Sequence, residues 1–310
     1  MGHLERVRGQ YFCSDSGEPV VLLHGGLVNS NWWGNQVREL RKQYRVVVMD
    51  SRGHGRSTRN AEHFGYDLMA SDVIGLMDFL KIPKAALVGW SDGAIIDLDI
   101  AMKHPERLTR LFAFAANSDP SGVADISGNA VVAAATARAE KEYEQLSPTP
   151  GEFPAFVAQI MKMWETQPNW TADDLSKITV PTWIVDGDRD EMIKRENTEF
   201  IAAQVPEAGL LLQPGVSHFS VLQDPEQFTA DVLHFLRHVM ARWAKRRPLE
   251  RGNRKRHARG SGKAGPGGVR RQSRAKGRKR TTQSRGRPGP ARQGCLSGGM
   301  RHCSSLDAGL

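Results

Sequence analysis

The sequence has few cysteines and no long apolar run. Its 310 residues hold three cysteines, an odd number, and two of them, Cys295 and Cys303, stand near the C-terminus. That pattern argues against a disulfide framework, and the spacing does not suit zinc ligands. No apolar run approaches the roughly 18 residues that span a bilayer. The first residues also lack the apolar segment of a secretory signal. We therefore expect a cytoplasmic protein without a membrane partner.

The last part of the chain lacks large apolar side chains. Residues 245–310 contain no Phe, Trp, Tyr or Ile, and 13 of them are glycine. They carry 20 Lys and Arg against two acids, a net charge of +18, whereas residues 1–244 carry 23 basic and 32 acidic side chains, a net charge of −9. Such a segment cannot bury enough apolar surface to offset the entropy of ordering. We expect an acidic folded body joined to a disordered basic tail.

The charge of this tail has two explanations. The tail is either an arm that binds nucleic acid or another polyanion, or an extension without a selected role. Its charge suits a polyanion, but the aromatic side chains that stack on bases are absent. The composition therefore favours the second explanation.

Short apolar or β-branched runs recur along the first 244 residues, and each is too short for a helix and suits a buried strand. They lie at 19–23, 45–49, 85–88, 111–115, 181–185 and 210–212. Between several of them stand helical patterns, such as the stripe that begins at Met69 and the one that follows Asp224. This alternation predicts an α/β fold, a mostly parallel sheet with helices on both faces.

Residues 119–176 interrupt the alternation, because they contain two helical runs and no strand pattern. A long insertion of this kind predicts a helical cap, with the core formed by residues 1–118 and 177–244. Caps choose substrates. Met161 and Trp164 of the second helical run are candidate substrate-binding residues, or they only pack the cap against the core.

The motif Gly89-Trp90-Ser91-Asp92-Gly93 follows one predicted strand and precedes a helical run. G-x-S-x-G in a strand, turn and helix context is typical of a nucleophilic serine on a tight turn. We expect side chains at positions 89 and 93 to collide with the serine, hence glycine at both. The helix N-terminus points its free N–H groups at the reacting carbonyl.

His24-Gly25-Gly26 follows the first strong strand pattern. Glycines there let the backbone approach a substrate, so Gly26 and Asp92 are the predicted N–H donors of an oxyanion hole. We expect His24 to hold the shape of this loop. Trp32, Trp90 and Phe219 are further candidate substrate-binding residues, although burial in the core explains the tryptophans equally well.

A serine nucleophile needs a base that a third group orients. Asp186, Asp188 and Asp190 follow one predicted strand, and His218 follows the next. The carboxyl ends of parallel strands meet at one edge, so His218 is the predicted base. Asp190 lies deepest in its loop and is the preferred acid, and Asp119 is the other position that the topology allows.

Five segments stand in the order typical of the α/β-hydrolase fold superfamily, at residues 24–26, 50–57, 89–93, 187–190 and 217–219. The body of the chain resembles this superfamily, and the motif around Ser91 is similar to that of lactonases, esterases and valacyclovir-hydrolase-like enzymes. The resemblance implies Ser91 as nucleophile, His218 as base and Asp190 as acid, with Gly26 and Asp92 in the oxyanion hole. The 50–57 loop, with its Asp, Arg, His and Ser, has an expected structural role.

The sequence thus predicts a serine hydrolase that acts on a small-molecule carboxylic ester, thioester or lactone without cofactor or metal. A second interpretation keeps the same catalytic residues but cleaves carbon–carbon bonds or uses peroxide. A third is not enzymatic: a hydrolase-like binding protein with a polyanion-binding tail.

Overall fold

The computed structural model describes residues 8–14, 16–246 and 301–307. In this part of the chain, eight strands form one sheet in the order β7-β6-β5-β4-β2-β3-β1-β8. Strands β2 to β7 are mutually parallel, whereas β1 is antiparallel to β3, and β8 to β1. The strands are β1 (Arg8–Cys13), β2 (Glu18–Leu23), β3 (Tyr44–Asp50), β4 (Ala85–Trp90), β5 (Leu108–Phe114), β6 (Thr182–Gly187), β7 (Gly209–Gln213) and β8 (Arg301–Asp307).

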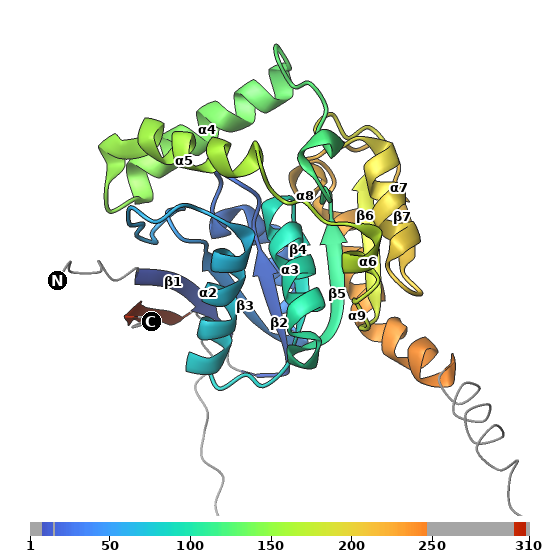
Figure 1. Ribbon diagram of the computed structural model, residues 1–310. Coiled ribbons are helices and arrows are strands. Elements are labelled where there is room, and N and C mark those ends of the chain that lie inside the picture. The colour runs from blue at the N-terminus through green and yellow to red at the C-terminus, as the bar shows by residue number, and fades with distance from the viewer. Residues whose placement is uncertain (1–7, 15, 247–300, 308–310) are drawn as a thin grey trace, which may run out of the picture. The chain divides into compact units, whose positions relative to one another are not determined.

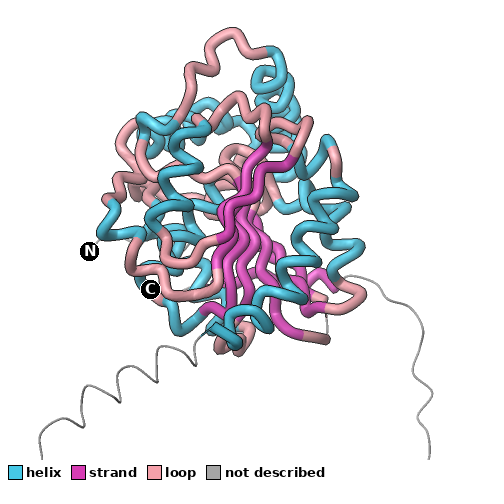
Figure 2. The backbone as a smooth tube through the Cα atoms, turned by 90° about the vertical axis from the view of Figure 1, so that its right-hand side faces the viewer, coloured by secondary structure: helices cyan, strands magenta, loops and turns pink. Residues whose placement is uncertain are grey.

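Helices cover both faces of the sheet, which Figure 2 shows edge-on as strands between two helical layers. Alternate residues of each strand enter two separate cores, because successive side chains of a strand point to opposite faces. Leu23 and Leu87 pack with α2 and α3, whereas Leu22 and Val88 pack with α1 and α9. The helices are α1 (Gly34–Leu40), α2 (Tyr66–Phe79), α3 (Asp92–Lys103), α4 (Ala130–Leu146), α5 (Phe153–Trp164), α6 (Ala172–Leu175), α7 (Arg195–Gln204), α8 (Ser220–Gln223) and α9 (Pro225–Arg246).

This architecture confirms the predicted fold class, a mostly parallel sheet with helices on both faces. Each of the six predicted strand runs lies in or overlaps one of the strands β2 to β7. The central strand β4 is buried along its whole length, as a strand covered on both faces must be.

The segment expected to form a cap is helical. Residues 119–176, all of which are described, contain α4, α5 and α6 and no strand. Figure 1 shows α4 and α5 above the end of the sheet at which the parallel strands terminate. Their aromatic side chains pack together, with the rings of Tyr143 and Phe156 stacked 5.2 Å apart. The cap boundaries themselves stay a prediction.

The expectation of a fully disordered tail needs a correction at residues 301–307. These form β8, which pairs with the edge strand β1 and places Cys303 opposite Tyr11. Strand pairing uses backbone N–H and C=O groups, so it does not require the aromatic side chains that the tail lacks. Residues 247–300 and 308–310 lie outside the described part, and the expectation for them stays a prediction.

Where the chain is described, none of its helices has the length together with the apolar character that crossing a membrane requires.

Candidate active site

Ser91 occupies a strained turn between β4 and α3. Its backbone has φ 56° and ψ −122°, a conformation that side-chain-bearing residues rarely adopt. The Ser91 N–H donates to the Phe114 carbonyl of β5, and the Ser91 carbonyl accepts from Ile95 in the first turn of α3. The turn is therefore fixed on both sides, and it presents a half-buried serine at the sheet edge.

The glycines of the motif allow close backbone contacts. A Cβ at residue 93 would lie 2.1 Å from the Leu23 carbonyl oxygen, and one at residue 89 would lie 2.5 Å from the Ala94 backbone. The expected collision with the serine is thus replaced by collisions with β2 and α3. Side chains at these positions would push the helix away from the sheet.

His218 and Asp190 meet at the same edge. The Nδ1 atom of His218 lies 2.8 Å from Oδ2 of Asp190, and both side chains are almost fully buried. The other Asp190 oxygen accepts hydrogen bonds from the Met192 and Ile193 N–H groups, 2.7 Å each. Trp90, the neighbour of Ser91, donates from Nε1 to the His218 carbonyl at 2.8 Å, which ties the histidine loop to the serine turn.

This pairing sets the ionisation of both groups. Burial alone lowers the pKa of His218, but the Asp190 carboxylate outweighs burial, so the pKa is raised above its ordinary value of 6.5. Burial likewise disfavours the Asp190 charge, yet His218 and the backbone donors lower the pKa of Asp190. The ring is thus oriented by an acceptor at Nδ1, which leaves Nε2 to act on a proton.

Asp186 lies beside Asp190 and supports it, a role that the sequence did not predict. Burial and the Asp190 carboxylate raise the pKa of Asp186 to about 9, so it carries a proton at neutral pH. Its oxygens accept from Thr198 Oγ1 at 2.5 Å and from the Gly187 N–H at 2.9 Å. From the sequence, Asp186 was placed directly after a strand without a role, and its position before a glycine in an acidic loop was the available signal.

Asp119 has other partners. One of its oxygens accepts from the Ser121 N–H at 2.9 Å and caps the short 3₁₀ helix Pro120–Gly122. The other accepts from Ser118 and Asn197. The carboxylate thus shapes the start of the cap segment, while Asp190 is the acid that contacts His218.

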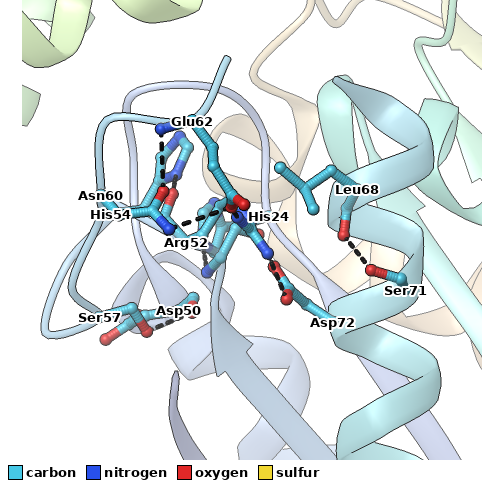
Figure 3. Close-up of polar contacts among 11 residues, drawn as sticks. His24, Asp50, Arg52, His54, Ser57, Asn60, Glu62, Leu68, Ser71 and Asp72 are labelled. Atoms are coloured by element: carbon cyan, nitrogen blue, oxygen red, sulfur yellow. Dashed lines mark hydrogen bonds and ion pairs between the residues drawn. The ribbon is translucent and has the colours of Figure 1, made fainter. Parts of the chain in front are cut away.

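The loop that follows β3 forms a second polar cluster (Figure 3). Arg52 holds Asp72 of α2 through two hydrogen bonds of 2.6 Å, and Asp50 accepts from the Ser30 and Arg56 N–H groups. His54 donates from Nδ1 to the Arg52 carbonyl at 2.9 Å. These contacts tie strand, turn and helix together.

His24 belongs to this cluster and holds the glycine loop. Its Nε2 accepts from the Ser51 N–H at 3.1 Å, so its Nδ1 donates to the Gly25 carbonyl at 2.7 Å. Burial lowers the pKa of His24, which keeps the ring neutral. The expected role of His24 in shaping the loop agrees with these bonds.

Gly26 and Asp92 approach each other beside Ser91. A Cβ on Gly26 would lie 2.3 Å from Trp164 and 2.6 Å from an Asp92 oxygen, so only glycine fits there. The Asp92 carboxylate accepts from Tyr66 at 2.8 Å and from Trp164 Nε1 at 2.9 Å. Burial raises the pKa of Asp92 to about 6, although both donors and His218 oppose this shift. Asp92 thereby joins the serine turn to the cap helix α5.

A cavity of about 760 Å³ opens at this point between core and cap. Ser91 and His218 line it, as do Gly26 and Asp92. Four of the five candidate substrate-binding residues also line it: Trp90, Met161, Trp164 and Phe219. The sequence missed its wall on α4, where spacing of three and four in an alanine-rich helix was the signal.

Trp32, the fifth candidate, is not among the residues that line the cavity. It is buried behind Trp90, with ring centroids 5.7 Å apart, and Arg138 covers its ring. Its Nε1 donates to Glu142 of α4 at 2.7 Å, so it anchors the cap instead. The position of Trp32 agrees with the alternative interpretation, burial in the core.

Comparison with known proteins agrees with the fold. The model of the alpha/beta hydrolase family matches residues 20–232. The chain belongs to this family. As an alpha/beta hydrolase, it is 28% identical to the serine hydrolase BPHL of Mus musculus over 234 residues, which cover 71% of this chain and 80% of the relative.

Two further similar proteins have different described activities. A putative non-heme chloroperoxidase of Synechocystis is 28% identical over 257 residues, 71% of this chain and 92% of the relative. The solved structure of Est816, described as an enzyme that degrades N-acyl homoserine lactone, superposes with a TM-score of 0.59 at 26% identity, and the match covers 74% of this chain and 97% of that one. This alpha/beta hydrolase is thus similar to enzymes that act on small molecules, and the chain is a hydrolase of this fold.

Proposed function

We propose that this alpha/beta hydrolase cleaves carboxylic esters, thioesters or lactones through an acyl-enzyme on Ser91. The observation that carries the proposal is the 2.8 Å bond between His218 and Asp190 at the wall of a cavity that Ser91 also lines. The strained serine turn and the close approach of Gly26 to Asp92 support it. The likeness to a serine hydrolase and to a lactone-degrading enzyme agrees with this substrate class.

In this mechanism, Ser91 Oγ attacks the carbonyl carbon while His218 Nε2 takes the hydroxyl proton. The N–H groups of Gly26 and Asp92 hold the oxyanion, and Asp190 stabilises the imidazolium. When the C–O bond of the substrate breaks, His218 returns the proton to the departing alcohol. Water then attacks the acyl-enzyme by the same route and releases the acid.

A fluorophosphonate probe tests the nucleophile. We expect the probe to label Ser91, and Ser91→Ala to lose the label together with about 10⁴-fold or more of the esterase rate. The matched control is Ser176→Ala, because Ser176 is an exposed serine whose hydroxyl donates to the Asp173 carbonyl of its own short helix. Labelling that survives in Ser91→Ala contradicts the assignment.

A second candidate function uses the same residues with hydrogen peroxide in place of water, which would convert the acyl-enzyme into a peracid. The likeness to a putative non-heme chloroperoxidase favours it. The test compares peracid formation with hydrolysis from one ester in the presence of peroxide. Peracid as the main product would make this the principal activity.

Two other expectations stay predictions. One is the cytoplasmic location, and the other is a polyanion partner for the basic tail, most of which lies outside the described residues. Salt-dependent DNA binding that disappears when the chain is truncated after Ala244 would establish that partner.

A further inference from the structure

The cavity beside Ser91 has an apolar wall that comes from one face of α4. Val132, Ala135, Thr136 and Ala139 line it, and their spacing of three, four and seven places them on the same side of a helix. The Thr136 hydroxyl donates to the Val132 carbonyl at 3.0 Å within the helix, so its proton already has an acceptor. The opposite side of α4 presents Ala134 and Ala137 to solvent.

This wall is held in place from outside the cavity. Glu142, one turn beyond Ala139, accepts from Asn29 at 2.6 Å and from Trp32 at 2.7 Å. Arg138 pairs with Glu142 at 2.7 Å and lies over the Trp32 ring. The distance between the α4 wall and the serine turn is therefore set by a network of bonds.

Charged groups that line the cavity already have partners or face water. Asp92 is bonded to Tyr66 and Trp164, and Lys194 is exposed and donates to the Ser121 carbonyl at 2.8 Å. Asp125 and Glu165 are exposed. Among the lining residues, the buried group that can become a cation is His218, and its ring is already paired with Asp190. A carboxylate deep in this cavity would lose its hydration without a partner.

The two ends of the cavity differ. At the α4 end, Ala139 is 2% exposed and Phe219 is buried. At the α5 end, Met161 is 45% exposed and Glu165 is also exposed. In an acyl-enzyme the leaving group departs first, while the acyl group stays until water attacks. The open end therefore suits the leaving group, and the enclosed end suits the acyl group.

We propose that the enclosed end takes an uncharged, apolar acyl chain, and that Val132, Ala135 and Ala139 of α4 set its length. This inference rests on the proposed acyl-enzyme mechanism and adds the substrate class. The cavity, about 760 Å³, lies within the range of sites that enclose ligands much larger than an acetyl group. Each methylene buried against the wall contributes to binding in the transition state.

The test measures kcat/KM of the full chain for 4-nitrophenyl esters from acetate to decanoate. Between acetate and octanoate, kcat/KM rises about three- to fourfold for each methylene. The charged hemiglutarate ester reacts at least about 100-fold more slowly than the pentanoate ester. A flat chain-length profile, or equal rates for these two esters, overturns the inference.

Variants of α4 locate the effect. Ala135→Trp lowers the octanoate-to-acetate ratio of kcat/KM at least about tenfold, because the indole fills the space that the longer chain needs. Ala134→Trp, the matched control on the exposed side, leaves the ratio unchanged. Val132→Ala enlarges the cavity at this wall and shifts the preference to an ester with a longer acyl chain. Misfolding cannot produce such a shift. If folded Ala135→Trp loses activity toward all the esters equally, this result contradicts the role of α4.

Fluorophosphonate labelling of each variant separates this inference from the proposed function. If the wild-type protein is labelled at Ser91 but shows no chain-length preference, the acyl-chain inference fails and the proposed function stands. If the wild-type protein is not labelled, both fail. If Ala135→Trp alone is not labelled, it has lost its fold, and Val132→Ala decides whether α4 sets the chain length.

Discussion

His218 and His54 are 2% and 1% exposed, yet their surroundings move their pKa values in opposite directions. The pKa of His218 is raised because Asp190 lies beside its ring. The pKa of His54 is lowered to about 3, because burial and the neighbouring His24 outweigh its bond to the Arg52 carbonyl. Burial by itself therefore does not make a catalytic base. The proposed base, His218, also has a charge partner on one ring nitrogen and lines a cavity.

The two clusters also differ in what their carboxylates face. Asp190 accepts from backbone N–H groups and His218, with the protonated Asp186 beside it. Asp50 and Asp72 instead hold arginines. Arginine stays charged at every working pH, so these pairs give the loop a fixed shape. The comparison separates the proposed site of proton transfer from a site for structural support.

The largest expected effect is that of Asp190→Asn. An amide at this position holds the ring but favours the wrong tautomer, and kcat falls about 10⁴-fold. The pKa of His218 falls as well, because the carboxylate that raised it is gone. Steady-state kinetics measure the first effect, and NMR titration of the ring measures the second. A loss of less than about tenfold would mean that another acid orients His218.

The second effect is the pH dependence of the wild-type enzyme. His218 must be neutral to accept the serine proton, so kcat/KM rises as pH increases through the pKa of His218. Because that pKa is raised, the acid limb lies above pH 6.5. Rate measurements from pH 5 to 9 check this. An acid limb below pH 6.5 would mean that the surroundings of His218 lower its pKa, as those of His54 do.

The third effect concerns the structural cluster. Arg52→Ala leaves Asp72 without its partner and lowers the free energy of unfolding by about 3 kcal/mol. The folded fraction still reacts with the fluorophosphonate probe, because Arg52 takes no part in catalysis. Urea unfolding measures the loss, and Arg38→Ala, at an exposed arginine, serves as control within about 0.5 kcal/mol. An unchanged stability would show that the pair does not support the fold.

The smallest effect is a change in how steeply the free energy of unfolding depends on pH in acid. Unfolded His54 binds a proton as pH falls through 6.5, whereas the folded residue does so only near pH 3. The unfolded state therefore gains protons between these values, and stability falls as pH decreases. His54→Phe removes this contribution and becomes more stable relative to wild type as pH falls from 6.5 to 3. A constant difference across this range would mean that His54 titrates normally.

The parallel strands and the location of the candidate site could be predicted because their signals are local. Apolar runs mark β2 to β7, and the motifs around Ser91 and His218 stand directly after strands. Strand β1 (Arg8–Cys13) was not predicted, since its sequence has neither an apolar run nor a clear alternation and its pairing with β3 joins distant residues. The pairing of β8 depends on β1, so it could not be predicted either.

The cavity wall was beyond sequence reasoning for a different reason. Which side of α4 faces Ser91 depends on how the cap packs, and the anchors of the cap connect residues more than 100 positions apart, as Trp32 and Glu142 do. The protonation of Asp186 likewise arises from its burial beside Asp190, which only the folded arrangement reveals.

Asp92 has a consequence for engineering this enzyme. Its backbone N–H stands where the oxyanion forms in the proposed mechanism, and its carboxylate holds Trp164 of the cap helix. Changing residue 92 alone to obtain a new substrate range would alter the catalytic turn and release the cap at once. Libraries that vary Asp92, Tyr66 and Trp164 together can exchange the whole three-residue unit and keep the turn intact.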